Sequence, residues 1–447
     1  MKTSIDRRDF IKTGMAAGVA VALGPKILSA APEKEKKIRI GIIGIGLRGT
    51  GHLEGLLQRG DVTVPAVCDI DPERFPIAQD LIVKAGQKKA DVYQGSETAY
   101  KKLLGRGDLD GVLIAAPWLW HFPMALDAMK TGVPVATEVA GAASVQECWD
   151  LVEAHETTGT PFMFLENVCY RRDVMAVLNM IRQNLFGELI HCRCGYQHDL
   201  REVKFQPGAE FGEKGVHEAR WRTEQAVKRN GDLYPSHGAG PVAMVLGINR
   251  GNRFVSLTST ATKSRGLHNY IVDHGGENHP NAKIAFALGD VVTTLIRCAN
   301  GESVLVTHDT NLPRPYSLGF YVHGTRGIWN HDGDRIYFEG RSPEAHVWEK
   351  DEAYLRQYDH PLWKKHESKA EGAGHGGMDF FVLNAFVECL KRKQPFPIDV
   401  YDAAAWKCIT PLSEHSIAEG GEPQEFPDFT RGTWIRRTPV FALGEEY

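Results

Sequence analysis

The sequence lacks an apolar run long enough to span a membrane. A spanning helix needs about 20 consecutive apolar residues, and the apolar run Met15–Leu23 is far shorter. Basic residues are not in surplus either, because 52 Lys and Arg are balanced by 56 Asp and Glu, for a formal net charge of −4. A chain without a basic surplus cannot neutralise many phosphates. We therefore expect no membrane span in the mature protein and no nucleic-acid partner.

Paired cysteines and metal-ligand clusters are also missing. Cys192 and Cys194 alternate on one predicted strand, but no second pair completes a zinc site. No group of His, Asp or Glu has the spacing of a metal site. Five further cysteines stand singly in apolar segments, which is typical of cysteines that are buried as small hydrophobic residues. They are Cys68, Cys148, Cys298, Cys389 and Cys408. We predict mostly free, buried thiols and no metal.

The first residues have the pattern of an export signal. Arg7-Arg8 is followed by a short apolar run that is rich in Ala and Gly, and Leu28-Ser29-Ala30 offers the small residues of a cleavage site. We predict that residues 1–31 are a twin-arginine signal peptide. This route carries proteins that have already folded in the reducing cytosol. The mature protein is then expected in the periplasm or outside the cell.

The region from residue 36 to 167 alternates short apolar runs with helical patterns. The predicted helices cover His52–Gln58, Pro72–Lys84, Phe122–Lys130 and Val145–Thr157. The predicted strands are Ile38–Ile43, Val62–Cys68, Gly111–Ala116, Pro134–Glu138 and Pro161–Leu165. Nearly continuous apolar strands between helices are typical of a parallel sheet covered on both faces. We predict a Rossmann nucleotide-binding domain at 36–167.

Residues 168–447 have a different pattern, which predicts a substrate-binding α+β domain. A helix at Val174–Gln183 precedes longer alternating runs, separated by turn residues as in antiparallel hairpins. These runs are Leu189–His198, Phe254–Thr262, Asp290–Cys298, Ser303–Asp309 and Gly319–Gly324. Helices at Met378–Lys391 and Ala403–Glu419 are expected to return and cover the first domain or the sheet. The intervening Arg341–Gly377 is interpreted as a long ordered loop. The fold class is thus α/β, with an N-terminal parallel sheet and a C-terminal α+β domain whose open sheet is mostly antiparallel.

A glycine-rich turn marks the nucleotide site. Gly44, Gly46 and Gly49, with Leu47 and Arg48 between them, follow a predicted strand and open a helix. Asp69 ends the next strand, where an acid meets the ribose hydroxyls. The glycines let backbone N–H groups approach the pyrophosphate at the helix N-terminus. Because Asp69 would repel a 2′-phosphate, we predict that NAD is bound in preference to NADP.

Three further segments follow strands at the edge where the cofactor would lie. They are Trp118-Leu119-Trp120-His121, Glu138-Val139 and Asn167. Indole rings at strand ends can stack on a nicotinamide, an adenine or a sugar, although packing between domains would also explain them. Asn167 is placed to bond the nicotinamide ribose or amide. We include all of these residues in the predicted cofactor site.

The motifs together resemble the glucose-fructose oxidoreductase/inositol dehydrogenase superfamily, and within it the NAD-dependent glycosidases of glycoside hydrolase family 109. The resemblance covers essentially the whole mature chain. Besides the glycine-rich turn it rests on Trp118–His121, Thr137–Ala140, Gly195–Arg201, Asp232–His237 and Pro313–Tyr316. Ordinary dehydrogenases of the superfamily carry a Glu-Lys-Pro run, whereas this chain has Glu138-Val139-Ala140. The Asp that usually precedes the catalytic His by four residues is Leu233 here, and both departures are shared by the glycosidase subfamily.

The resemblance implies a redox-neutral glycoside hydrolysis. NAD takes a hydride from C3 of the sugar, C2 loses a proton, the C1–O bond breaks by elimination, water adds, and the hydride returns. The implied substrate is a glycan with a terminal N-acetylhexosamine, α-linked N-acetylgalactosamine in particular. An NAD-dependent sugar dehydrogenase remains an alternative, as does a sugar-binding protein that retains a structural nucleotide. The oligomeric state stays open, with a homo-oligomer compatible with the sequence.

The same resemblance places the substrate residues. His237 and Tyr234 lie three residues apart at a predicted helix start, on one face, and are the first candidates for proton transfer. Tyr170 is a further candidate base. Arg222 would hold a hydroxyl or the acetamido carbonyl. The predicted substrate contacts are Tyr196, Arg222, Tyr234, Pro235, Ser236, His237 and Tyr316.

Overall fold

The computed structural model describes residues 36–206, 211, 215 and 218–447, and Lys37–Tyr447 form one compact unit. The predicted signal peptide lies outside the described residues. All eight cysteines lie within them, and each is buried and free, as predicted. No helix in this described part is long and apolar enough to cross a membrane.

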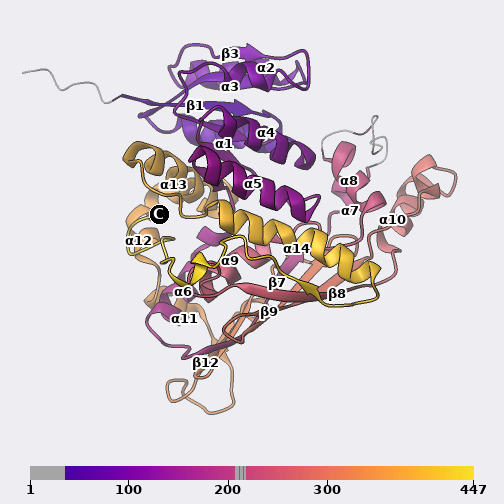
Figure 1. Ribbon diagram of the computed structural model, residues 1–447. Coiled ribbons are helices and arrows are strands. Elements are labelled where there is room, and N and C mark those ends of the chain that lie inside the picture. The colour runs from indigo at the N-terminus through magenta and orange to yellow at the C-terminus, as the bar shows by residue number, and fades with distance from the viewer. Residues whose placement is uncertain (1–35, 207–210, 212–214, 216–217) are drawn as a thin grey trace, which may run out of the picture. The chain divides into compact units, whose positions relative to one another are not determined.

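A six-stranded parallel sheet forms the first layer, in the order β3-β2-β1-β4-β5-β6 (Figure 1). Its strands are β1 (Ile38–Ile43), β2 (Val62–Cys68), β3 (Asp91–Tyr93), β4 (Gly111–Ile114), β5 (Val135–Thr137) and β6 (Phe162–Phe164). The helices between them are α1 (Leu47–Leu57), α2 (Arg74–Lys84), α3 (Tyr100–Leu104), α4 (Trp118–Lys130) and α5 (Val145–Thr158). This order, with the first strand beside the fourth, confirms the predicted Rossmann sheet.

The apolar pattern located the buried strands and missed the exposed one. Strands β1 and β2 have the predicted bounds because their apolar runs are nearly continuous, interrupted only by Arg39 and Thr63. Strand β3 was not predicted because Asp91 and Val92 are exposed and give no apolar run. Helix α4 begins at Trp118, four residues before the predicted start. The two tryptophans that were expected at exposed strand ends therefore lie in the first turn of a helix.

The second sheet has nine strands in the order β14-β13-β12-β11-β7-β10-β9-β8-β15. Only the pair β7–β10 is parallel among its neighbours in the described chain, so the prediction of a mostly antiparallel sheet is confirmed. The strands are β7 (Leu189–Gln197), β8 (Phe254–Ala261), β9 (Val291–Cys298), β10 (Ser303–Asp309), β11 (Tyr321–Gly324), β12 (Gly327–Asn330), β13 (Arg335–Phe338), β14 (Glu349–Lys350) and β15 (Gln424–Glu425). The helices of this part are α6 (Arg172–Arg182), α7 (Arg201–Lys204), α8 (Ala219–Lys228), α9 (Ser236–Leu246), α10 (Gly266–Gly275), α11 (Glu352–Gln357), α12 (Pro361–Ala370), α13 (Met378–Arg392) and α14 (Val400–Ala418).

The expectation of a long loop at Arg341–Gly377 was wrong. This stretch contains β14, α11 and α12. Helix α12 begins with Pro361 in its first turn, and the side chain of His360 accepts a hydrogen bond from Leu362 N at 3.2 Å. Leu362 and Trp363 are then buried. Charged residues dominate the composition of the stretch, but this cap and two buried side chains are enough to fix a short helix.

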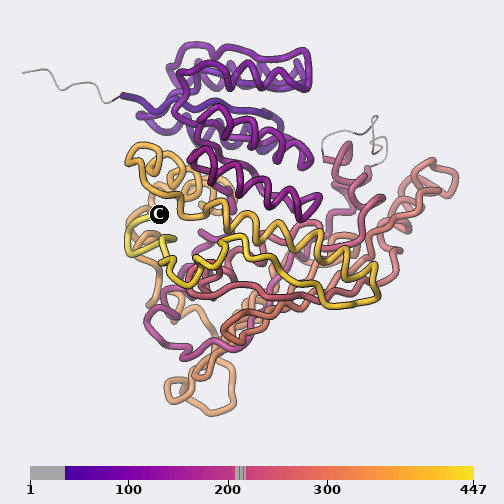
Figure 2. Tube along the Cα trace, in the orientation of Figure 1, coloured from indigo at the N-terminus to yellow at the C-terminus, as the bar shows by residue number. Residues whose placement is uncertain are grey.

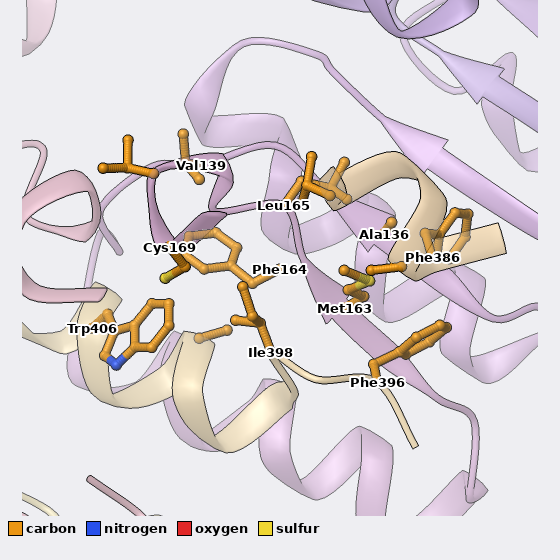
Figure 3. Packing of buried hydrophobic residues seen from close by; sticks show 14 of the residues in the cluster. Ala136, Val139, Met163, Phe164, Leu165, Cys169, Phe386, Phe396, Ile398 and Trp406 are labelled. Atoms are coloured by element: carbon orange, nitrogen blue, oxygen red, sulfur yellow. The ribbon is translucent and has the colours of Figure 1, made fainter. Parts of the chain in front are cut away.

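The last two long helices return to the first sheet, as predicted. Helix α13 packs against α1 and β1, while α14 packs against α5 and β6 on one side and β8 on the other (Figure 2). Figure 3 shows Phe164 and Leu165 at the end of β6 among side chains from these late segments, including Phe386 of α13 and Trp406 of α14. This packing fixes the point where β6 ends and the functional residues that follow it begin.

Candidate active site

The glycine-rich turn has the shape that a dinucleotide requires. Gly44 has φ +83°, and a Cβ there would lie 2.7 Å from the backbone of Ala115. A Cβ on Gly49 would lie 1.9 Å from the carbonyl oxygen of Gly44, so α1 can pack this closely only without a side chain. Around Gly46, by contrast, no atom lies within 4 Å of the position of a Cβ. The turn is therefore close-packed on its inner side and open at Gly46, where a pyrophosphate can approach backbone N–H groups.

Asp69 supports the same turn from the end of β2. Its Oδ2 accepts a hydrogen bond from Ile45 N at 2.7 Å, and its Oδ1 accepts one from Asp71 N at 2.9 Å. The carboxylate thus faces the turn from the position where a ribose would lie. Leu47, the first residue of α1, is 64% exposed beside it. This arrangement fits NAD and disfavours a 2′-phosphate.

Glu138 lies at the centre of a charged network that links several predicted cofactor residues. Its Oε1 accepts a hydrogen bond from Arg48 Nε at 2.8 Å and lies 2.5 Å from His52 Nε2, while its Oε2 accepts one from Val139 N at 2.9 Å. Burial alone would raise the pKa of Glu138, but Arg48 and His52 hold it far below the ordinary range. Asp379 belongs to the same network, because its Oδ2 accepts a hydrogen bond from Arg48 Nη1 at 2.8 Å. Its Oδ1 accepts one from Asn167 Nδ2 at 2.7 Å, which connects Asn167 to the network.

The segment that begins at Trp118 divides between two environments. Leu119 is 59% exposed, and Trp120 is half-buried. His121 is buried, with its Nε2 2.7 Å from the carbonyl oxygen of Ala116, and burial lowers its pKa to about 4. Trp118 instead faces the substrate residues described next.

The predicted substrate residues form a compact cluster of rings. The rings of Tyr196 and Tyr234 have centroids 4.6 Å apart, and the ring of His237 lies 4.9 Å from that of Tyr234 and 5.5 Å from that of Tyr196. Tyr316 completes the cluster at 6.5 Å from Tyr196 and is 49% exposed. Burial raises the pKa of the Tyr196 and Tyr234 phenols, so both act as hydrogen-bond donors near neutral pH.

Two glycines explain why α9 brings His237 to Tyr196. A Cβ on Gly238 would lie 2.5 Å from Gly195 N, so α9 rests directly on the backbone of β7. Pro235 is the N-cap residue of α9 and so lies directly before the helix rather than in its first turn. Ser236 is fully buried, and its Oγ has no hydrogen-bond partner among the described residues.

Arg222 lies against the same cluster. Its guanidinium is 4.9 Å from the ring centroid of Trp118 and 5.4 Å from that of Tyr234, while its Nε lies 2.9 Å from Glu218 Oε2. The residue is 9% exposed. A guanidinium held between aromatic rings keeps its planar face fixed and offers its remaining N–H groups to a carbonyl or hydroxyl.

Glu166 is a site residue that sequence reasoning missed. Its side chain is fully buried, and its Oε1 lies 2.7 Å from Nδ1 of His237. Because a carboxylate only accepts, the Nδ1 carries the proton and the Nε2 is left as the free base. The only indication of this role in the sequence is the position of Glu166 directly before Asn167, after the last parallel strand.

Lys204 was also missed. It is buried, and its Nζ donates to Thr310 Oγ1 at 2.7 Å and to Asn311 Oδ1 at 2.6 Å. Burial, reinforced by Arg222, lowers its pKa to about 7. It lines a small cavity together with Trp118, Tyr196, Arg222, Tyr234 and His308.

Tyr170 is not brought to this cluster. Its side chain is fully buried between Phe381 and Phe441, whose ring centroids lie 6.1 and 4.9 Å away, and its hydroxyl has no hydrogen-bond partner in the described chain. A phenol enclosed in the core cannot reach a substrate that binds among the other tyrosines. The described residues also contain no group of three His, Cys, Asp or Glu that could hold a metal.

The fold and the site define an NAD-binding Rossmann enzyme, and comparison with known proteins gives its family. Residues 38–165 match the oxidoreductase family with an NAD-binding Rossmann fold, and residues 170–436 match the C-terminal domain of glycosyl hydrolase 109. A solved NAD-binding oxidoreductase from Klebsiella pneumoniae has the same fold, with a TM-score of 0.66 at 17% identity over 88% of this chain and 99% of that chain.

Full-length relatives agree. A glycosyl hydrolase family 109 protein of Stenotrophomonas maltophilia is 53% identical over 99% of this chain and 100% of its own length. An alpha-N-acetylgalactosaminidase of Tannerella forsythia is 51% identical over 98% of this chain and 99% of its own. The chain belongs to glycosyl hydrolase family 109 and is an NAD-dependent glycosidase. Residues 4–24 match the signal sequence of the twin-arginine pathway, so export by that route is supported.

Proposed function

We propose that the protein removes terminal N-acetylhexosamine, and α-linked N-acetylgalactosamine in particular, from glycans in the periplasm or outside the cell. The observation that carries this proposal is the buried Glu166–His237 pair, which faces Tyr196 and Tyr234 beside Arg222. The relative from Tannerella forsythia, named for this activity, supports the choice of sugar. The proposal includes a nucleotide-binding domain at residues 36–167 and a substrate-binding domain at 168–447.

The same proposal assigns the residues that bind NAD. The turn at Gly44, Gly46 and Gly49 binds the pyrophosphate, and Asp69 binds the ribose. Leu119, Trp120, Glu138-Val139 and the amide of Asn167 line the nicotinamide half, whereas Trp118 faces the sugar and His121 is buried beneath this segment. NAD held by these residues would supply reversible hydride transfer at C3 of the sugar.

His237 moves the proton that accompanies this exchange. Its Nε2 accepts the proton of the C3 hydroxyl, because Nδ1 is committed to Glu166. The resulting imidazolium is stabilised by the buried carboxylate and donates a hydrogen bond to the C3 oxygen. A polarised C3 ketone acidifies the hydrogen on C2. When that proton passes to solvent, the C1–O bond breaks, the aglycone takes up a proton and leaves as the alcohol, and water then adds at C1 while C2 regains a proton.

The other side chains orient the sugar. The phenols of Tyr196, Tyr234 and Tyr316 donate hydrogen bonds to sugar oxygens, since the pKa of each is raised above the ordinary value of a phenol, which is itself protonated at neutral pH. Arg222 holds the acetamido carbonyl. Pro235 and Ser236 set the start of α9 and thereby the position of His237. We assign Tyr170 no role in proton transfer.

A panel of nitrophenyl glycosides, tested on the purified protein without added NAD, examines this function. We expect cleavage of the α-N-acetylgalactosaminide, no net NADH, and deuterium at C2 of sugar released in D₂O. A deuterium label at C3 of the substrate should slow turnover if hydride transfer limits the rate. Net NADH formation from free sugar would instead identify a dehydrogenase. Full hydrolysis after removal of NAD, without exchange at C2, would show that the mechanism is wrong.

A further inference from the structure

His375 and the three glycines around it form a tight turn that the proposed function does not use. His375 has φ +52°, a left-handed conformation that is unusual for a residue with a side chain, and Gly376 and Gly377 follow at +64° and +94°. The turn leads directly into α13. A Cβ on Gly374 would lie 2.6 Å from Asp379 Oδ2, so a glycine is needed where the turn meets that carboxylate.

Asp379, in the first turn of α13, binds three groups at once. Its Oδ2 accepts a hydrogen bond from Arg48 Nη1 at 2.8 Å and lies 2.8 Å from His375 Nδ1, and its Oδ1 accepts one from Asn167 Nδ2 at 2.7 Å. The side chain is 12% exposed. Burial alone would raise the pKa of Asp379, but His375 and Arg48 hold it far below the ordinary range. The hydrogen bonds from Arg48 and Asn167 therefore hold the carboxylate in its ionised form.

The two main partners of Asp379 come from opposite ends of the cofactor site. Arg48 belongs to the glycine-rich turn at the start of α1, and Asn167 follows β6 at the nicotinamide end. Arg48 also binds Glu138, so its guanidinium is held between two carboxylates. Charge-assisted bonds of this kind are stronger and more directional than neutral ones, and breaking a buried pair is costly.

We propose that Gly374–Asp379 is a clasp that retains NAD. The Asp379 carboxylate connects Arg48 of the pyrophosphate-binding turn to Asn167 at the nicotinamide end. This connection opposes the separation of the turn from the nicotinamide end that would release the cofactor. Asp379 and His375 are positioning residues, because they act through Arg48 and Asn167. An enzyme that regenerates its NAD in each turnover need not release it, and one exported with the cofactor bound benefits from slow release.

The chain contains a matched control for this clasp. Near the far end of α1, Arg59 Nη2 lies 2.5 Å from Glu388 Oε1 of the same helix α13. Both ion pairs join the α1 region to α13, but only Asp379 lies at the cofactor turn. Asp379→Asn and Glu388→Gln each remove one carboxylate charge with little change in shape.

The test measures NAD retention without any substrate, so it does not depend on which glycoside is cleaved. Radiolabelled NAD bound to the full mature protein is chased with an excess of unlabelled NAD, and melting temperatures are recorded. We expect Asp379→Asn to release NAD at least about tenfold faster, the scale of one lost charge-assisted bond. Glu388→Gln should release it at the wild-type rate despite a comparable loss of melting temperature.

Wild-type retention in Asp379→Asn, or equal acceleration in both variants, would overturn the proposal. If Asp379→Asn fails to fold, His375→Ala replaces it, because this side chain is 54% exposed and its removal leaves the core intact. That variant should release NAD about threefold faster, as expected for loss of one exposed hydrogen bond. An unchanged release rate in His375→Ala would then count against the clasp.

Discussion

Replacing Glu166 with Gln tests how much of the catalytic power of His237 comes from its buried partner. The substitution keeps the volume of the side chain but removes the charge that faces Nδ1 at 2.7 Å. A neutral amide no longer stabilises the imidazolium, and its NH₂ group can impose the wrong tautomer. Loss of a tautomer-fixing carboxylate lowers kcat by about 10²–10⁴-fold, which corresponds to roughly 2.7–5.4 kcal/mol of transition-state stabilisation.

The assay is the kcat and KM for a nitrophenyl α-N-acetylgalactosaminide, with NAD content and melting temperature as controls. KM should change little, because Glu166 is fully buried and touches no substrate. In a His237→Ala background, Glu166→Gln should add almost no further loss, since residues acting as a unit are strongly non-additive. Wild-type kcat in the single variant would refute the reasoning. So would effects that simply multiply in the double variant, because Glu166 would then act independently of His237.

Asp69→Ala should weaken NAD binding and relax discrimination against NADP, because the carboxylate that orders Ile45 N and repels a 2′-phosphate is lost; an unchanged preference in binding titrations would refute this role. For Lys204, the folded pKa of about 7 lies below the ordinary 10.5, so the folded state binds fewer protons between these values. The stability of the wild type relative to Lys204→Met should therefore rise with pH across that window, by at most about 1.4 kcal/mol per pH unit. The prediction would be wrong if the difference in the free energy of unfolding between the wild type and Lys204→Met were the same at pH 6.5 and at pH 9. Replacing Arg7 and Arg8 with Lys should leave unprocessed protein in the cytosol, whereas normal export in cell fractions would exclude the twin-arginine signal.

The sequence was informative where a pattern is local. The first two strands were predicted with the correct bounds because they lie inside a sheet covered by helices, which makes them nearly continuous apolar runs. Tyr234 and His237 were placed together because they lie three positions apart in the chain, at the start of a helix. The ring of Tyr196 was tied to them only by the family resemblance, and the contact itself depends on Gly195 and Gly238, where α9 and β7 meet.

The residues that were missed have partners far away in the chain. Glu166 meets His237 across 71 positions, and Lys204 meets Thr310 across 106. No periodicity or spacing encodes such a pairing, because it is created by the tertiary packing of elements that are distant in the chain. Arg48 illustrates the same limit. Its position in the glycine-rich turn was evident, but its partner Asp379 lies 331 residues later.

This long separation has a consequence for the order of synthesis. A ribosome completes the glycine-rich turn early, yet the helix that carries Asp379 and packs on α1 emerges only near the end of translation. The nucleotide site therefore cannot be finished while the chain is still being made. A chain cut short before α13 lacks the Asp379 contacts to Arg48 and Asn167. Only a nearly complete chain can therefore join the glycine-rich turn to α13 before it enters a pathway that accepts folded cargo.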